Sequence, residues 1–320
     1  MTSEAEDTVT NEAEAGGEGA AGAPFTEARA RALLAAAGER VDAARLLALG
    51  ENAVFALEET GAAGDGGHGT VVRIGRGPEL VERAERELRV ADWLAQHGVP
   101  AVRAARPQVT VVDGHPLTYW RRLPAPVRDA TPGDLARLLR LVHELPAPPR
   151  ALSLPPRDLL SGVERWLRLA GDAVPPDDAA YLRARRDELA AAVRELTPAL
   201  PSGPIHGDAL PRNVLAGPDG PVLLDLETFS DDLREHDLVV MELSRDRYGL
   251  GDEAYAEFVR VYGWDVREWP GHRLLRGARE TASCAWVAQH APENPAAREE
   301  FARRVASLRA GETGVRWYAF

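Results

Sequence analysis

Apolar residues recur at helical spacing between Leu80 and Gln96 and predict one amphipathic helix there. The stripe consists of Leu80, Ala84, Leu88, Ala91, Leu94 and Ala95. Glu87 falls within the same stripe. A carboxylate on the buried side of a helix is costly unless a cation lies beside it. The pattern therefore predicts a buried helix whose Glu87 is paired with a basic residue.

Short apolar runs bounded by Gly, Pro and polar residues predict strands around this helix. These runs are Leu46–Gly50, Ala53–Leu57, Thr70–Ile74, Ala101–Ala105 and Leu117–Leu123. A helical pattern precedes them from Phe25, and five glycines in Glu58–Gly69 mark a flexible hairpin connection.

After Pro124 the pattern is helical almost throughout. The predicted helices are Thr131–Glu144, Arg157–Ala170, Pro176–Leu196, Leu233–Arg247, Asp252–Tyr262, Arg273–His290 and Pro295–Ala310. Strands early and helices late predict an α+β fold, with a lobe over residues 25–122 built on a small sheet and a larger, mostly helical lobe over 123–320.

Composition narrows the chemistry. The 38 basic residues of the 320-residue chain are all arginine, so a Walker-type P-loop and Schiff-base lysine chemistry are excluded. The net charge is −12, but residues 1–24 hold six acids and no base, and they are predicted to form a disordered acidic tail. We expect neither a nucleic-acid nor a membrane partner, and a cytoplasmic location. Cys284 is expected to be a buried core thiol. The oligomeric state stays open.

A concentrated polar motif occupies residues 205–227, IHGDALPRNVLAGPDGPVLLDLE. Gly217-Pro218-Asp219-Gly220 predicts a turn, and pairing Ala216 with Pro221 places Asn213 beside Leu224 or Asp225. Amide and carboxylate oxygens together suit Mg²⁺. Asp208 lies five residues before Asn213, near enough to add an acidic group to Asn213 and Asp225 at the same predicted site.

His206-Gly207-Asp208, followed by Asn213 and Asp225, resembles the H-G-D-x-x-x-x-N and D-x-E pattern of the aminoglycoside phosphotransferase and choline kinase family. These small-molecule kinases have the two-lobed protein-kinase-like fold. Arg73 stands at the position of the family's phosphate-binding lysine and Glu87 at that of its helix glutamate. The resemblance covers roughly residues 45–240 and implies an N-terminal nucleotide-binding lobe and a C-terminal catalytic and substrate-binding lobe.

The resemblance implies a role for each matching residue. Asp208 would be the catalytic base, Asn213 and Asp225 the Mg²⁺ ligands, and His206 an organiser of the loop. Glu227 would add a metal or substrate contact, and Asp237 would support the loop. The remaining implied nucleotide contacts are Arg73 with Glu87, the Gly50-Glu51-Asn52 turn over the phosphates, and Tyr119 and Arg121 in a hinge over Tyr119–Leu123.

The sequence thus predicts a Mg²⁺-dependent phosphotransferase that moves the γ-phosphate of ATP or GTP to a hydroxyl of a small molecule. The expected acceptor is an aminoglycoside-like or other hydroxylated antibiotic or natural product, as in antibiotic resistance. Amine-bearing, cationic acceptors are favoured by five acidic residues near the expected cleft, namely Glu227, Asp231, Asp232, Glu242 and Glu280.

Three alternatives remain open. A metabolic kinase would act on choline or on an amino-acid or sugar derivative. A nucleotide-binding pseudokinase is suggested by Arg73 in place of lysine, and Arg73 with Glu87 could be a structural ion pair only. A metallophosphohydrolase could be drawn from His206, Asp208, His236 and Asp237, although Asn213 would then have no role.

Overall fold

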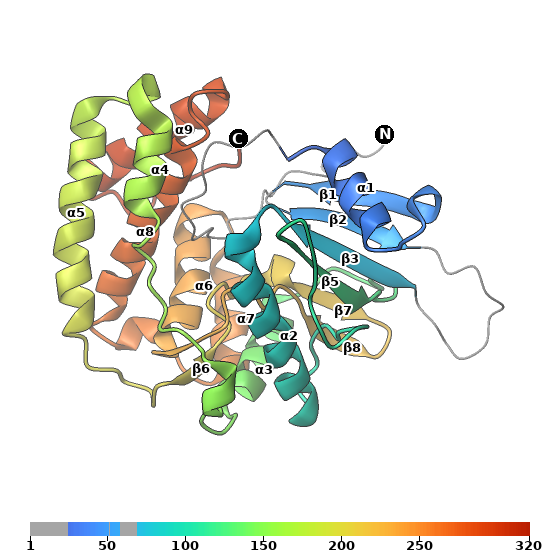
Figure 1. The fold of residues 1–320 in the computed structure, drawn as a ribbon. Coiled ribbons are helices and arrows are strands. Elements are labelled where there is room, and N and C mark those ends of the chain that lie inside the picture. The colour runs from blue at the N-terminus through green and yellow to red at the C-terminus, as the bar shows by residue number, and fades with distance from the viewer. Residues whose placement is uncertain (1–24, 51, 58–68) are drawn as a thin grey trace, which may run out of the picture. The chain divides into compact units, whose positions relative to one another are not determined.

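The computed structural model describes residues 25–50, 52–57 and 69–320 (Figure 1). The predicted tail, Glu51 and residues 58–68 of the Gly-rich link lie outside the described residues. The predicted α+β architecture is confirmed, with an antiparallel sheet early in the chain and helices after it. The described chain forms two compact units, an N-terminal unit of residues 25–155 and 211–230 and a C-terminal unit of residues 156–210 and 231–320.

A five-stranded antiparallel sheet is the centre of the N-terminal unit. In spatial order its strands are β1 (Ala44–Leu49), β2 (Asn52–Leu57), β3 (Thr70–Gly75), β5 (His115–Arg121) and β4 (Thr110–Val112). Helix α1 (Glu27–Ala36) begins at Thr26, whose hydroxyl accepts from the Arg29 amide. Leu33 and Leu34 of α1 join Phe55 and Val72 in a buried cluster on one face of the sheet.

Helix α2 (Val81–Gln96) follows the short 3₁₀ turn Pro78–Leu80 and also contacts β5 (Figure 1). Its predicted stripe is buried or half-buried, and Glu87 is buried within it as the pattern indicated. The apolar spacing and the absence of glycine inside the helix explain why this element was predicted almost residue by residue.

The predicted hairpin is confirmed. Strands β7 (Val214–Gly217) and β8 (Gly220–Leu223) pair in the expected register, with Ala216 opposite Pro221. The Leu224 amide donates to the Asn213 carbonyl at 2.8 Å. Helix α3 (Pro132–His143) packs against this hairpin.

The hairpin belongs to the N-terminal unit, which therefore differs from the predicted lobe over 25–122. Leu223 pairs with Ala101, its amide donates to Pro100, and its carbonyl accepts from Val102. These bonds tie residues 211–230 to the segment after α2, while α3 carries the unit on to residue 155.

The C-terminal unit is a group of helices around α8 (His272–Ala288). The others are α4 (Val163–Ala170), α5 (Pro176–Arg194), α6 (Glu235–Arg247), α7 (Asp252–Tyr262) and α9 (Pro295–Arg309), with short strands β6 (Gly203–Ile205) and β9 (Ser230–Asp232). Over both units, further 3₁₀ turns lie at Val41–Ala43, Arg150–Leu152, Gly171–Ala173, Pro211–Asn213 and Val266–Glu268. Cys284 is fully buried in this core as predicted, and burial raises the pKa of its thiol to about 12.

Two sequence predictions differ from the structure. The segment Ala101–Ala105 forms only isolated bridges, and the edge strand is β4 instead. Helix α4 begins at Val163 and not at Arg157, because the Arg157 amide donates to Asp232 and the Leu160 amide to Asp158, which holds this segment in a turn. In the part of the chain that the structure describes, no helix is both long and apolar enough to cross a membrane.

Candidate active site

Arg73 and Glu87 form the ion pair that the sequence predicted. Arg73 projects from β3 on the face that it shares with Val54 and Thr118, which are directly opposite it on the neighbouring strands. Its guanidinium contacts the carboxylate of Glu87 on α2. The Glu87 side chain is only 3% exposed, and the ion pair offsets the free-energy cost of burying its carboxylate.

A second carboxylate completes this cluster. Glu227 lies 2.6 Å from Arg83 and 3.7 Å from Arg73. Arg83 precedes Glu87 by one helical turn on α2, so both reach the same face of the helix. Sequence reasoning missed Arg83, although this spacing was the available signal. Glu227, expected to add a metal or substrate contact, is engaged by arginines in this structure.

The electrostatics of the cluster follow from burial and from its acidic side chains. Burial disfavours the charge on Arg73, but Glu87, Glu227 and Asp225 outweigh it and raise the pKa of the guanidinium. Burial raises the pKa of the Glu87 carboxyl from 4.5 to about 7, against the attraction of Arg73. Arg73 therefore remains a cation while Glu87 titrates near neutrality.

Asn213 and Asp225 lie at the open end of the β7–β8 hairpin. The hydrogen bond from the Leu224 amide to the Asn213 carbonyl places Asn213 beside Leu224, as the predicted register required. Asp225 has a left-handed backbone (φ 51°), which is uncommon outside glycine and recurs at functional turns. Among the described residues, no three His, Cys, Asp or Glu side chains form a group that could hold a metal ion.

The expected phosphate turn is described only in part. The Gly50 amide donates to the Asn52 carbonyl at 3.0 Å, and the Gly50 carbonyl accepts from Arg76 Nε at 3.1 Å. Asn52 lies two residues before Val54 on β2, so its side chain is on the same face of the sheet as Arg73. Glu51 lies outside the described residues.

Tyr119 and Arg121, expected to contact the nucleotide, do not share the face of Arg73. Tyr119 is opposite Val72 on the face covered by α1, where it is fully buried and Arg106 stacks on its ring at 3.6 Å. Its carbonyl accepts from Ala105 at 2.8 Å, and the Arg121 amide donates to Arg103 at 2.8 Å. Side chains alternate along β5, so Thr118 and Trp120 lie on the Arg73 face, and the hinge expected at Tyr119–Leu123 stays a prediction for the backbone of that segment.

In the C-terminal unit, Asp237 fixes the His206–Asp208 loop. Its two carboxylate oxygens accept from the His206 amide at 2.8 Å and the Gly207 amide at 2.7 Å. Gly207 has φ 85°, a conformation that favours glycine. His206 Nδ1 accepts from the Asp208 amide at 3.3 Å, a contact within the loop.

Two arginines that sequence reasoning missed contact this loop. Arg279 Nη2 donates to Asp208 Oδ1 at 2.5 Å, and Arg157 Nε donates to the Gly207 carbonyl at 3.0 Å. Arg279 is 71 residues from Asp208 in the sequence, and Arg157 lay in a segment that was predicted to be helical. No local pattern could have linked either one to the loop.

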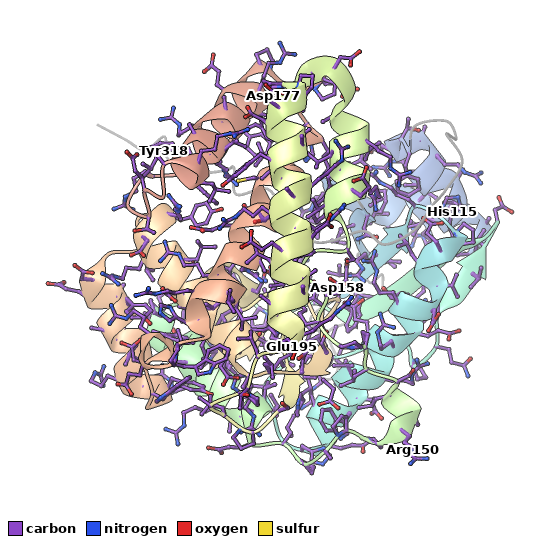
Figure 2. The ribbon with its side chains drawn as sticks, turned by 90° about the vertical axis from the view of Figure 1, so that its left-hand side faces the viewer. His115, Arg150, Asp158, Asp177, Glu195 and Tyr318 are labelled. Atoms are coloured by element: carbon purple, nitrogen blue, oxygen red, sulfur yellow. The ribbon has the colours of Figure 1, made fainter. Side chains whose placement is uncertain are left out.

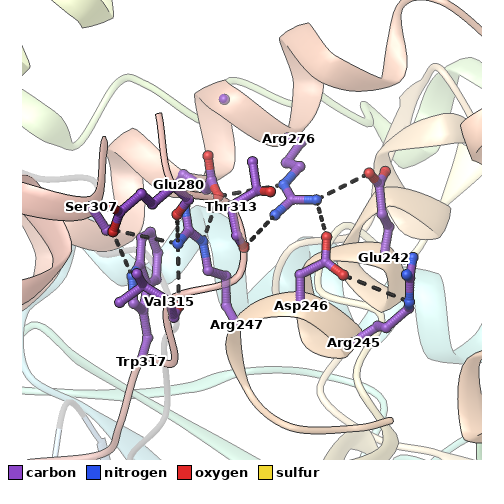
Figure 3. Close-up of polar contacts among 12 residues, drawn as sticks. Glu242, Arg245, Asp246, Arg247, Arg276, Glu280, Ser307, Thr313, Val315 and Trp317 are labelled. Atoms are coloured by element: carbon purple, nitrogen blue, oxygen red, sulfur yellow. Dashed lines mark hydrogen bonds and ion pairs between the residues drawn. The ribbon is translucent and has the colours of Figure 1, made fainter. Parts of the chain in front are cut away.

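The acidic residues expected to attract an amine are largely engaged. Arginines of α6 and α8 neutralise two of them, with Glu280 2.8 Å from Arg247 and Glu242 3.2 Å from Arg276 (Figure 3). Asp232 accepts from the Arg157 and Leu233 amides, both at 2.7 Å. The premise for a cationic acceptor is therefore not met by Glu242, Glu280, Asp232 or Glu227.

The metallophosphohydrolase alternative is also weakened by these contacts. Both Asp237 oxygens accept backbone amides.

Comparison with known proteins identifies the family of the chain. A sequence model of the phosphotransferase enzyme family matches residues 42–275, and the chain belongs to that family. No curated protein matches the chain by sequence.

Solved structures share the two-lobed protein-kinase-like fold. An amicoumacin kinase in complex with AMP-PNP and Ca²⁺ superimposes with a TM-score of 0.68 at 15% identity, covering 91% of this chain and 98% of its own. An aminoglycoside phosphotransferase from Streptomyces rimosus gives 0.55 at 20% identity (77% and 96%). A choline kinase from Streptococcus pneumoniae gives 0.56 at 13% identity (88% and 99%). The predicted family resemblance and fold class are confirmed.

Proposed function

We propose that this phosphotransferase moves the γ-phosphate of ATP or GTP to a hydroxyl of a small molecule, with Asp208 as the base. The observation that carries the proposal is the loop geometry, in which Asp237 holds both amides that precede Asp208 and Arg279 holds one Asp208 oxygen. A carboxylate fixed in this way can accept the hydroxyl proton while the hydroxyl oxygen attacks phosphorus.

The hairpin supplies groups that fit a magnesium ion. Asn213 offers an amide oxygen and Asp225 a carboxylate, both hard donors, on a backbone held by the Leu224–Asn213 bond. Mg²⁺ commonly binds through one or two protein oxygens together with nucleotide phosphates. When bound, the ion would neutralise charge on the transferred phosphate. Glu227 would reach it only by leaving Arg83.

Arg73 would bind the nucleotide phosphates, with Glu87 holding its guanidinium in place. Gly50 and Asn52 would border the phosphates from the β1–β2 turn. The Tyr119 and Arg121 side chains lie on the other face of the sheet, so a hinge contact with the base would come from the backbone of Tyr119–Leu123.

For the acceptor we propose a hydroxylated natural product or antibiotic, in keeping with the amicoumacin, aminoglycoside and choline kinases that share the fold. A cationic acceptor is not part of this proposal, because the acidic residues that suggested it are engaged by arginines and backbone amides.

The test is a transfer screen of purified protein with Mg²⁺, ATP or GTP, and a panel of hydroxylated antibiotics, amino alcohols and sugars, read by mass spectrometry. Asp208→Asn should abolish the product and still bind Mg-nucleotide. Asp219→Asn, in the exposed hairpin turn, is the matched control and should be fully active. Product formation that survives Asp208→Asn would remove the proposed base. Nucleotide binding without any product would favour the pseudokinase.

A further inference from the structure

The C-terminal unit contains a cavity that the proposed reaction does not use. Its volume is about 660 Å³, within the range of roughly 300–1,000 Å³ typical of small-molecule sites. It is enclosed by residues 156–161, the second half of α5 and the start of α6. In Figure 2, Asp158 lies beside α5 and Glu195 marks the end of that helix.

His236, one of the residues that line the cavity, has a buried nitrogen without a partner in the described chain. His236 is only 2% exposed, and its Nδ1 has no hydrogen-bond partner among the described residues. Its Nε2 is 4.0 Å from Asp232 Oδ1. A buried polar nitrogen without a partner is costly, so a ligand that bonds to it would gain free energy on binding.

One arginine of the cavity is available to an anion. Three arginines and two aspartates line the cavity, and Arg186 is paired with Glu164 and Asp187. Asp232 already accepts two backbone amides and Asp158 accepts the Leu160 amide, whereas no contact of the Arg194 guanidinium is found in the described part of the chain. The rest of the wall is mainly apolar, including Leu159, Val193 and Leu233.

We propose that this cavity binds an amphipathic anion, with its apolar body against the leucine-rich wall, its negative group at Arg194 and a hydrogen bond to His236. Arg157 lines the cavity and also donates to the Gly207 carbonyl, so an occupant contacts the residue that holds the catalytic loop. The anion is either the phosphoryl acceptor or an effector. The binding itself does not depend on the proposed function, whereas the acceptor assignment does.

The binding test uses two fluorescent probes that differ in one charge, 8-anilinonaphthalene-1-sulfonate and its uncharged analogue N-phenyl-1-naphthylamine. Both should bind the wild-type protein, and Ala190→Phe, which places a ring in the cavity, should weaken both at least tenfold. Ala191→Phe, on an exposed position of the same helix, should change neither. Arg194→Gln should weaken the sulfonate about three- to fivefold and leave the neutral probe unchanged.

Three results of this binding test would overturn the proposal: no sulfonate binding to the wild type, equal binding to Ala190→Phe, or equal effects of Arg194→Gln on both probes. Thermal unfolding of each variant shows whether it is folded. The Arg194→Gln comparison is independent of Ala190→Phe, so a misfolded cavity variant would not protect the proposal.

The source of the anion is decided with 12-hydroxydodecanoate and dodecanoate as competitors of the sulfonate probe, with Mg-ATP present. Displacement and a phosphate ester on the hydroxy acid would identify the acceptor. In that step the hydroxyl oxygen forms a bond to the γ-phosphorus, the bond from that phosphorus to the bridging oxygen breaks, ADP leaves, and the hydroxyl proton passes to Asp208. Displacement by both acids without ester would identify an effector site. Failure of both to displace the probe, with the transfer screen positive, would reject this site and leave the proposed function standing.

Discussion

Arg279 of α8 donates to Asp208 of the His206–Asp208 loop across 2.5 Å, and the two side chains are 12% and 4% exposed. The bond engages Oδ1, and Arg279 also lies 3.5 Å from the Gly207 carbonyl. Because Arg279 lies on helix α8, its guanidinium restricts the rotation of the Asp208 carboxylate. Arg279 is therefore a positioning residue for the proposed base, supplied by a helix far away in the sequence.

Replacing Arg279 should impair transfer without impairing nucleotide binding. We expect Arg279→Met to lower kcat about 10- to 100-fold, since a general base loses much of its effect when its geometry is released. The KM for nucleotide should change less than about twofold, and Arg279→Lys should recover part of kcat. Steady-state kinetics on the acceptor found in the screen provide the measurement.

The matched control is Arg273→Met, at an exposed position of the same helix, which should leave kcat unchanged. An Arg279→Met enzyme with wild-type kcat would show that Asp208 does not need this partner.

Asp237 should be important for stability because one carboxylate serves two buried amides. Asp237→Asn keeps one acceptor oxygen and leaves the His206 or Gly207 amide without its charged partner. We expect a loss of about 2–3 kcal/mol in the free energy of unfolding. Urea denaturation measures it. The exposed Asp231→Asn is the control and should stay within about 0.5 kcal/mol of wild type. An equally small change for Asp237→Asn would show that the Asp237 carboxylate does not stabilise the loop.

Local patterns were sufficient wherever the determinant lies within one element. The stripe of α2 placed Glu87 on the buried side, and the Gly217–Gly220 turn fixed the hairpin register to the residue. The family motif singled out the His206–Asp208 loop, which Asp237 holds in the structure. In each case the relevant residues are neighbours in one helix or one hairpin, so their spacing in the sequence is their spacing in the fold.

The missed features depend on tertiary contacts. Arg279 and Arg157 reach the His206–Asp208 loop from distant segments, and Arg157 does so because its amide bonds to Asp232 and delays the start of α4. The face of Tyr119 depends on the pairing partner of β5, which the sequence does not reveal. Turn formation at residues 157–162 overrides a helical pattern, and the same segment lines the proposed anion cavity.

The start of α3 should make an acid-sensitive contribution to stability. Asp134 is fully buried, completes a capping box with Thr131, and accepts from Arg128 at 2.5 and 3.0 Å. Hydrogen bonds from Arg128, the Thr131 amide and Arg137, in that order, outweigh the effect of burial and hold the pKa of this carboxyl well below its usual 3.8. A lowered pKa adds stability above pH 3.8 that is lost as the pH falls further.

Asp134→Asn should therefore cost about 2 kcal/mol at pH 7, a value reduced for the solvent exposure of the two arginines, and the cost should shrink below pH 3.8. Thr131→Ala should cost about 1 kcal/mol at every pH, because it removes only the uncharged cap. Urea unfolding between pH 2.5 and 7 separates the two. A pH-independent cost for Asp134→Asn would show that its charge is unimportant.

Glu87 should give the opposite pH dependence. Burial raises the pKa of its carboxyl from 4.5 to about 7, so between these values the folded protein keeps a proton that the unfolded chain releases. Stability from this group is therefore full below pH 4.5 and falls as the pH rises to 7. Glu87→Gln cannot ionise, so its free energy of unfolding should rise relative to that of the wild type by up to about 3 kcal/mol between pH 4.5 and 7. The exposed Glu85→Gln on the same helix should show no such trend. Parallel stability curves for Glu87→Gln and wild type would instead mean that Arg73 keeps Glu87 ionised throughout, and the ion pair would then hold Arg73 in place at every pH in that range.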